Sequence, residues 1–280
     1  MTDRTSTPAG VVRIAARAGA ADCCAIAVMA KASHPGRTKT RLSPPLTLEQ
    51  AAELNTVFLR DIAENVARAA ERADIACYMA FGPPGAAAFF EHHWQADVGL
   101  LEAWMPNFGD CLFHTVRRLL GMGYGAACVL NSDSPTLPTS VLVETAQALQ
   151  RPGDRIVVGP CIDGGYYLLG MKQAHRRLFE HVAWSTEHVF RQTLERAVEL
   201  RLETVQLPVW YDVDDSRSLQ SLVRETRDGV SFSSMHRSHE ATHTAAFLRR
   251  GAGDGSLPDI GDANLSVSVM TTPANAATSG

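Results

Sequence analysis

The chain alternates between short apolar segments of strand length and longer segments in which apolar residues recur every three or four positions. Short uncharged apolar segments are typical of buried strands, and a recurrence near 3.6 residues is typical of amphipathic helices. The predicted strands are residues 25–30, 74–81, 98–104, 126–130, 155–159, 166–169 and 202–207. The first predicted helix follows a capping box at Thr47–Gln50. The other predicted helices are residues 86–93, 109–120, 141–149, 185–200 and 215–224. Ser185 is the predicted N-cap of the helix 185–200. This alternation predicts an α/β fold in three layers, with a mostly parallel central sheet and helices on both faces.

The predicted elements all lie within residues 24–228, which we interpret as one domain. Residues 1–23 contain cations but no continuous apolar segment of the kind a secretory signal has, so we predict a disordered leader. Residues 229–280 are rich in Ser, Thr, Ala, Gly and His and show little apolar periodicity, which predicts a disordered tail. Its histidines are interpreted as ordinary tail residues rather than as metal ligands: His236, His239 and His243.

Composition narrows the class of protein. The 280 residues are 45% hydrophobic and 20% charged, and the net charge is −4 at pH 7. A net acidic chain argues against a general nucleic-acid or membrane-surface binder, and the apolar segments are too short to span a bilayer. The six cysteines form no C-x-x-C pair, which argues against structural zinc and is typical of a reducing compartment. We therefore predict a cytoplasmic protein.

Basic residues are concentrated in the loop after the first predicted strand. Lys31, Arg37, Lys39 and Arg41 occur there around Gly36, and no acidic residue lies among them. In extended backbone the last three cations would point to one side, because side chains alternate along a strand. Cations that converge where a strand ends suit a chain of phosphates. The alternative is a solvated basic turn, since most charge runs are only that.

An aspartate follows the predicted strand 126–130 directly. The segment reads Asn-Ser-Asp-Ser-Pro, with Ser132 and Asp133 at its centre. A carboxylate at the end of a buried strand could hold Mg²⁺ (or Mn²⁺), because hard cations take oxygen ligands together with waters and substrate phosphates. The alternative is that Asp133 forms an Asx turn or caps the helix that follows.

Three more carboxylates lie just before the last predicted helix. Asp212, Asp214 and Asp215 fall within four residues and would repel one another without a nearby positive charge. Asp212 and Asp214 flank Val213 as residues of a strand would, which places both on one face. Asp215 is equally well explained as the N-cap of the helix.

Paired glycines precede two tyrosines in the segment Asp163-Gly164-Gly165-Tyr166-Tyr167. Glycines allow a positive φ or a close approach of the backbone, and a tyrosine offers a flat face with a hydroxyl. The segment could be a tight turn with nothing bound. We prefer the interpretation that Gly164, Gly165 and Tyr166 bind an acceptor molecule.

Six ordered segments between residues 25 and 225 together resemble a known family. They read AKASHPGRTKTRL, AAELNTVFLRD, NSDSPTLP, DGGYYLLG, WSTEHVFRQTL and YDVDD. In this combination the chain is similar to bacterial GT-A-type glycosyltransferase-like proteins. These are related in fold to the nucleotidyltransferases that make molybdopterin-dinucleotide cofactors, CMP-Kdo and phospholactate-guanosine compounds. The resemblance implies a Rossmann-related fold of the nucleotide-diphospho-sugar transferase type.

The resemblance also implies roles for particular residues. Gly36 and the cations Arg37, Lys39 and Arg41 would hold the phosphates of the nucleotide. Asp133 would be the metal-binding aspartate of the fold, in a variant of the usual D-x-D, and Asp214 would match a second metal aspartate late in the domain. One departure is clear, because residues 109–115 read GDCLFHT where the family commonly has Gly-Asp-Leu-Gly-x-Arg-Met.

We therefore predict a Mg²⁺-dependent transferase that moves a sugar from a nucleotide-sugar to a small acceptor. The predicted catalytic residues are Lys39, Asp133 and Asp163, the last as the carboxylate base that an inverting transfer needs. The predicted nucleotide-binding residues are Lys31, Gly36, Arg37, Lys39, Arg41 and Ser132, and the predicted metal ligands are Asp133, Asp212 and Asp214. One alternative is a nucleotidyltransferase that moves a nucleotide from an NTP to a phosphorylated small molecule and releases pyrophosphate. The other is a nucleotide-binding protein without catalysis, which the altered segment 109–115 would permit.

Overall fold

The first strand of the core, β2 (Cys24–Lys31), lies at the centre of the sheet with β3 (Ile75–Gly82) on one side and β5 (Ala126–Leu130) on the other, both parallel to it. The computed structural model describes residues 10–15, 21–94, 97–253, 255, 257 and 260. Within them the sheet has eight strands in the order β1-β4-β3-β2-β5-β7-β6-β8. The remaining strands are β1 (Val11–Arg13), β4 (Gly99–Glu102), β6 (Arg155–Pro160), β7 (Tyr166–Met171) and β8 (Glu203–Gln206).

The sheet is mixed rather than fully parallel. Strand β1 pairs antiparallel with β4, and β7 pairs antiparallel with both β5 and β6. Strands β2, β3, β4 and β5 form a parallel block, and β6 pairs in parallel with β8. Since β7 runs against both of its neighbours, β5 and β6 point the same way. Their carboxyl ends therefore meet at the same edge of the sheet, which is where ligands bind in folds of this class.

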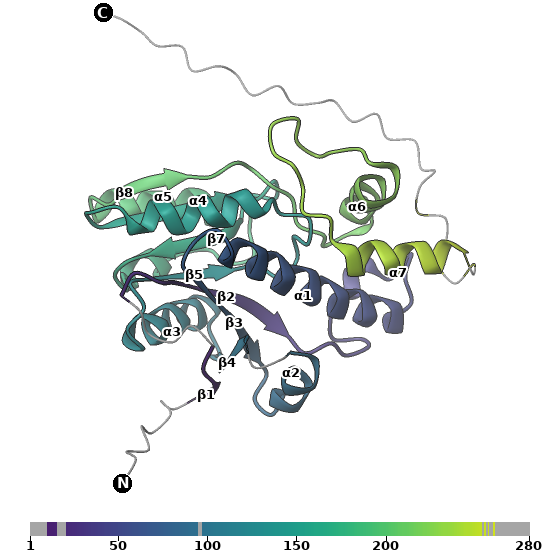
Figure 1. Cartoon of the computed structure of the whole chain (residues 1–280), viewed down its shortest axis with the longest axis horizontal. Helices are drawn as coiled ribbons and strands as arrows, with labels where there is room; N and C mark the ends of the chain where they lie inside the picture. The colour runs from purple at the N-terminus through teal and green to yellow at the C-terminus, as the bar shows by residue number, and fades with distance from the viewer. Residues whose placement is uncertain are drawn as a thin grey trace, which may run out of the picture.

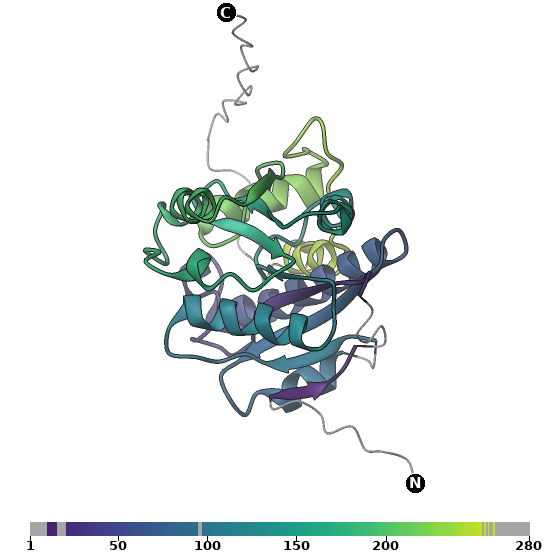
Figure 2. The ribbon, with the colours of Figure 1, turned by 90° about the vertical axis from the view of Figure 1, so that its left-hand side faces the viewer.

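Helices cover both faces of the sheet (Figures 1 and 2), which confirms the predicted three layers. The side chains of β2 show why, because Ile26 and Val28 enter the core on one face while Ala25 and Ala27 enter the core on the other. The first core is shared with α1 (Leu48–Ala70), α2 (Ala87–His93), α4 (Thr139–Gln150), α6 (Ser216–Asp228) and α7 (Thr242–Gly253). The second is shared with α3 (Phe108–Gly121), α5 (Val189–Glu199) and the short 3-10 helix η2 (Arg176–Phe179).

Two of the three N-caps that the sequence offers are confirmed. Helix α1 begins after a full capping box between Thr47 and Gln50, and α6 begins after Asp215, which accepts a hydrogen bond from the Ser218 backbone N–H. The prediction for Ser185 is wrong. That residue has φ +63° and α5 begins four residues later, at Val189.

The loop after β2 is also not extended, contrary to the prediction. Lys39 adopts a left-handed conformation with φ +51°, and residues Thr40–Leu42 form the 3-10 helix η1. Strict alternation of side chains along residues 37–41 is therefore lost. Lys39 and Arg41 are brought to the same place by this turn rather than by strand geometry.

The ends of the chain contain structure where disorder was predicted. Strand β1 extends the sheet by pairing with β4 through residues of the predicted leader. Helix α7, from the predicted tail, packs on α1 and α6 (Figure 1), and its Phe247 and Leu248 are buried in the core. The buried Asp61 of α1 accepts hydrogen bonds from the backbone N–H groups of His243 and Thr244 at 2.9 and 2.8 Å. The prediction of disorder is therefore wrong for residues 11–13 and 242–253.

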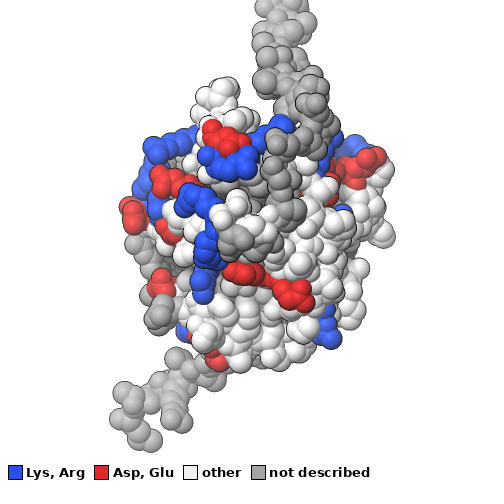
Figure 3. All heavy atoms as spheres, turned by 90° about the vertical axis from the view of Figure 1, so that its right-hand side faces the viewer, with Lys and Arg blue, Asp and Glu red and all other residues white. Residues whose placement is uncertain are grey.

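Within the described part of the chain, no helix combines the length and the apolar composition needed to cross a membrane. On the face shown in Figure 3, basic and acidic side chains are intermingled rather than segregated.

Candidate functional site

A lysine joins two aspartates at the edge where β2 and β5 end. The Lys39 Nζ lies 2.6 Å from Asp133 Oδ1 and 3.1 Å from Asp214 Oδ1, and it donates a further hydrogen bond of 2.6 Å to the Val213 carbonyl. Arg41 binds the other oxygen of Asp214 at 2.5 Å. The Lys39 side chain is only 6% exposed, whereas Asp133 and Asp214 are 29% and 35% exposed. The positive and negative groups that the motifs predict for the site therefore meet in space.

Backbone contacts fix this arrangement. Asp133 follows β5 in the sequence, and its carbonyl accepts the N–H of Val213 at 2.8 Å, which ties the aspartate segment 211–215 to the end of β5. The Ser134 hydroxyl donates to the Tyr211 carbonyl at 2.8 Å in the same place. Both contacts are buried or half-buried, so the two acidic segments are held as one unit.

A second acidic group lies beside the first. Cys161, Asp163 and Asp212 present one possible ligand atom each, and these atoms all lie within 4.8 Å of one another. Burial, and after it the negative charges of Asp163, Asp214 and Asp133, together raise the pKa of Asp212 from 3.8 to about 7. Burial likewise raises the pKa of the Cys161 thiol strongly. The site thus holds more negative charge than its own cations compensate.

This donor set fits a divalent cation. Hard cations such as Mg²⁺ take carboxylate oxygens, and a carboxyl group whose pKa is raised by its neighbours indicates a place where a positive charge would be stabilising. Asp133, Asp214 and Asp212 supply such oxygens at one edge of the sheet. Lys39 already contributes one positive charge between two of them, so any cation held there would share these carboxylates with the lysine.

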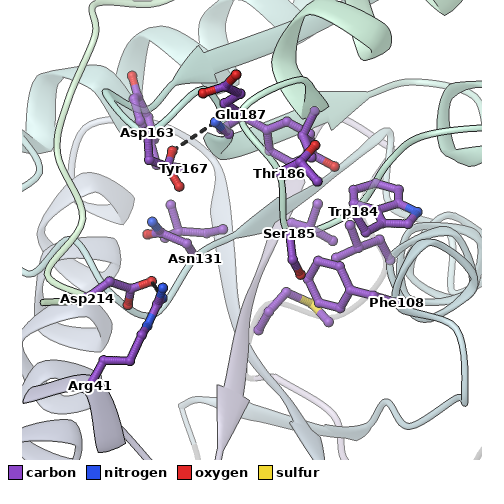
Figure 4. A pocket seen from close by; sticks show the side chains of 17 residues that line it. Arg41, Phe108, Asn131, Asp163, Tyr167, Trp184, Ser185, Thr186, Glu187 and Asp214 are labelled. Atoms are coloured by element: carbon purple, nitrogen blue, oxygen red, sulfur yellow. Dashed lines mark hydrogen bonds and ion pairs between the residues drawn. The ribbon is translucent and has the colours of Figure 1, made fainter.

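An open cavity of about 350 Å³ lies next to the aspartates. Figure 4 shows Arg41 and Asp214 at one side of it and Phe108 and Trp184 at the other. Its lining comes from β2, η1, α3, β5 and the residue after it, β7 and the turn before it, the loop that leads into α5 and the segment before α6: Met29, Arg41, Phe108, Leu112, Val129, Leu130, Asn131, Asp163, Gly165, Tyr166, Tyr167, Trp184, Ser185, Thr186, Glu187, Val189 and Asp214.

The paired glycines bring the loop before α5 against the cavity. Gly164 has φ +87°, and a Cβ at this position would lie 2.2 Å from the Glu187 carbonyl oxygen. Only glycine fits there without moving one of the two loops. The Asp163 carboxylate accepts the Gly165 N–H at 2.8 Å, which holds the turn. Tyr166 begins β7 with its hydroxyl buried and without a hydrogen-bond partner.

The other predicted nucleotide-binding residues are placed around this site. Gly36 makes the turn after β2 with φ +74°, and Ser132 donates a hydrogen bond of 3.2 Å to Asp133. Lys31 and Arg37 are exposed, and in the described part of the chain neither forms an ion pair with the aspartates. The structure therefore groups Lys39 and Arg41 with Asp133 and Asp214, and it leaves the other two cations outside that group.

Several cavity residues were given no role by the sequence analysis. Phe108, Trp184 and Glu187 line the cavity, as does Asn131, whose Oδ1 is buried and has no hydrogen-bond partner. The only signal for Trp184 and Glu187 was their presence in a motif that carries the family resemblance, and Asn131 lay within the predicted metal segment. For Phe108 the sequence offers only an aromatic residue at a helix start.

Part of the chain matches a protein-family model. Residues 65–186 match the family described as "Uncharacterized protein conserved in bacteria (DUF2064)". Among solved structures, the chain is similar to a protein from Desulfovibrio desulfuricans G20 that is provisionally named a nucleotide-diphospho-sugar transferase. The two share 26% identity, with 82% of this chain and 95% of that one covered, at a TM-score of 0.70.

Weaker likenesses extend to cytidylyltransferases. A CMP:2-keto-3-deoxy-manno-octonic acid synthetase in complex with CTP matches with 11% identity, 74% and 100% coverage and a TM-score of 0.48. A cytidylyltransferase from Leptospira borgpetersenii serovar Hardjo-bovis matches with 9% identity, 87% and 99% coverage and a TM-score of 0.49. The search of curated proteins found no match. The α/β fold of a nucleotide-diphospho-sugar transferase, which the motifs predicted, is confirmed by the Desulfovibrio structure.

Proposed function

We propose that this chain is a divalent-cation-dependent transferase that takes a sugar from a nucleotide-sugar and moves it to a small acceptor. The observation that carries the proposal is the group formed by Lys39, Asp133 and Asp214 at the carboxyl edge of the sheet, with a cavity directly beside it. Such a site can hold a charged diphosphate on one side and an acceptor on the other. The similarity to the Desulfovibrio protein supports the same class of donor.

Lys39 and Arg41 are the residues that we assign to the phosphates of the donor. Both already contact Asp214, so their positions are fixed before the donor arrives, which lowers the cost of binding. Asp133, Asp214 and Asp212 are the residues that we assign to a divalent cation, Mg²⁺ or Mn²⁺. When bound, the cation would neutralise the charge that builds up on the leaving diphosphate.

Asp163 is the residue that we assign to acceptor activation. Its carboxylate lines the cavity, and one of its oxygens is held by the Gly165 N–H while the other can accept a proton from an acceptor hydroxyl. Asp212 lies within the same acidic group but does not line the cavity. Asp163 is therefore the better placed of the two carboxylates for this role.

Nucleotidyl transfer is the second candidate, and one observation favours it. Lys39 and Arg41 lie side by side on one loop, and two cations suit the three phosphates of an NTP as well as they suit a diphosphate. In that reaction a phosphate of the acceptor would attack the α-phosphate and pyrophosphate would leave. The products separate the two reactions.

The test is an incubation of the full chain with Mg²⁺, panels of NTPs and nucleotide-sugars, and a mixture of small hydroxyl and phosphorylated acceptors, in which the released nucleoside diphosphate or pyrophosphate is identified by anion-exchange chromatography. Release of a nucleoside diphosphate from a nucleotide-sugar supports glycosyl transfer. Release of pyrophosphate from an NTP contradicts it and supports nucleotidyl transfer. Binding of a nucleotide without release of either product would assign the chain to non-catalytic nucleotide binding.

A further inference from the structure

The cavity beside the aspartates also indicates what kind of acceptor it takes. We propose, on the basis of the proposed transferase function, that the acceptor is a hydroxyl compound that carries no phosphate and presents an apolar or aromatic ring face. The ring would pack against the open side of the wall that Phe108 and Trp184 form together, and the reacting hydroxyl would point toward Asp163 (Figure 4). Four features of the cavity support this assignment.

The wall farthest from Arg41 is aromatic. The rings of Phe108 and Trp184 meet edge to face with their centroids 5.5 Å apart, and Tyr166 meets Trp184 edge to face at 6.5 Å. Phe108 is 52% exposed although it is a large apolar side chain at the mouth of a cavity. Aromatic walls with one open face are typical of sites that stack a flat or ring-shaped ligand.

The floor continues this apolar character. Met29 of β2 and Val129 of β5 contribute to it from the sheet, and Leu112 contributes from α3. A strongly hydrated group such as a phosphate would have to give up water here without gaining hydrogen bonds. A ring face or a short hydrocarbon makes no hydrogen bonds to water, so it would give up none on entering the same space.

The charges that line the cavity are unsuited to a phosphorylated acceptor. Asp163, Glu187 and Asp214 are acidic, and among the described lining residues Arg41 is the one basic side chain. Arg41 is already paired with Asp214 and lies at the end that we assign to the donor. A phosphate on the acceptor would therefore face carboxylates without a cation of its own.

A buried hydrogen-bond acceptor is available for a hydroxyl instead. Asn131 donates from Nδ2 to the Ser134 hydroxyl at 3.1 Å, and Ser134 uses its own proton for the Tyr211 carbonyl. Ser134 must therefore accept from the Asn131 amide, which fixes the orientation of that amide. Asn131 is a residue of the cavity lining, and its Oδ1 is left buried and without a hydrogen-bond partner. A hydroxyl donor would satisfy this atom, and a phosphate dianion has no proton to offer.

The matched probes are phenyl β-D-glucoside, phenyl β-D-glucoside 6-phosphate and glucose. Dissociation constants would be measured by calorimetry on the full chain with Mg²⁺ and without a donor. We expect phenyl glucoside to bind at least about tenfold more tightly than either its phosphate or glucose. Tighter or equal binding of the phosphate overturns the charge argument, equal binding of glucose overturns the ring argument, and no measurable binding of phenyl glucoside overturns the inference.

Variants show whether the cavity is the place of binding. Trp184→Ala should weaken binding of phenyl glucoside at least about fivefold. Trp104→Ala, at a tryptophan that is 53% exposed and does not line the cavity, is the matched control and should leave it unchanged. Thr186→Lys adds a cation to the lining and should bring the affinity for the phosphate close to that for phenyl glucoside. Equal effects of the two tryptophan variants would overturn the placement.

These measurements separate the inference from the function on which it rests. Acceptor binding is read by heat and needs no turnover, whereas the proposed function is read by the nucleotide that is released. Nucleoside diphosphate release together with preferred binding of the phosphorylated probe would overturn the inference alone. Preferred binding of phenyl glucoside without release of a nucleoside diphosphate would overturn the proposed function alone.

Discussion

The Nζ of Lys39 lies 2.6 Å from Oδ1 of Asp133, although the two residues belong to loops that follow different strands. Strands β2 and β5 are adjacent and parallel, so their carboxyl ends bring both loops to one edge of the sheet. The lysine is almost fully buried in this contact, whereas the aspartate remains partly open to solvent. The pair is therefore a half-buried ion pair with fixed geometry beside the cavity-lining Asp214, rather than a mobile ion pair at the surface.

Replacement of this lysine should affect stability and metal binding in opposite directions. Lys39→Met removes the positive charge between Asp133 and Asp214, and we expect the free energy of unfolding without Mg²⁺ to fall by about 2 kcal/mol. Added Mg²⁺ should then stabilise the variant more than the wild type, since the carboxylates have lost their own counter-ion. Urea denaturation with and without Mg²⁺ measures both effects.

Arg37→Met is the matched control for this experiment. Arg37 belongs to the same loop but is exposed, so its loss should change neither the stability nor the effect of Mg²⁺ by more than about 0.5 kcal/mol. If the two variants behave alike, Lys39 does not act as the counter-ion of the aspartates.

Two adjacent aspartates should differ sharply in their importance. Asp214→Asn removes a carboxylate that contacts both Lys39 and Arg41, and we expect turnover with Mg²⁺ to fall at least about 100-fold. Asp215→Asn should be nearly neutral, because Asp215 is the N-cap of α6 and Asn caps a helix about as well. Initial rates across a Mg²⁺ titration compare the two variants, and similar losses would remove Asp214 from the metal site.

The raised pKa of Asp212 predicts a particular dependence of stability on pH. The folded protein keeps this carboxyl protonated up to about pH 7, whereas the unfolded chain releases the proton near 3.8. The folded state therefore binds more protons than the unfolded state in this window. The contribution of Asp212 to the free energy of unfolding is complete below the lower value and falls as the pH rises through the higher one.

Asp212→Asn should flatten this decline, and saturating Mg²⁺ should flatten it in the wild type by neutralising the neighbouring carboxylates. Denaturant unfolding at about pH 5 and about pH 8 measures the slope. Asp215→Asn is the control, since the hydrogen bonds from Ser218 lower the pKa of Asp215. The contribution of Asp215 to the free energy of unfolding is therefore present at both of these pH values and is lost only when the pH falls below its ordinary range. An unchanged slope in Asp212→Asn would show that another group titrates.

The sequence was sufficient for the centre of the fold because its strands are uncharged runs with clear stops. β5 has the predicted bounds, 126–130, and β2 differs from the prediction by one residue at each end. The meeting of Lys39 with Asp133 followed from the same pattern, since both residues come after parallel strands. The conformation of the loop did not follow, because a left-handed Lys39 has no signal in residue types that favour ordinary φ values.

Features that depend on distant contacts could not be predicted. Strand β1 has only three residues, and its pairing with β4 is not visible in its composition. The roles proposed for Phe108 and Trp184 depend on Phe108 remaining exposed and Trp184 only half-buried beside a cavity, and hydrophobicity alone would predict that both are buried. Helix α7 lies in a stretch rich in Thr, Ala and Gly, and its start is capped by Asp61 from another helix rather than by a neighbour in sequence.

That cap gives the last prediction, which concerns the docking of α7. Asp61→Ala leaves the N–H groups of His243 and Thr244 without their acceptor, so the free energy of unfolding should fall by about 2 kcal/mol. Asp61→Asn keeps one acceptor oxygen and should cost roughly half of that. Glu53→Ala is the control, because Glu53 pairs with Arg250 across the same two helices but at the surface, where such a pair contributes at most about 1 kcal/mol. Equal losses in Asp61→Ala and Glu53→Ala, measured by urea denaturation, would show that α7 is not held by the buried cap.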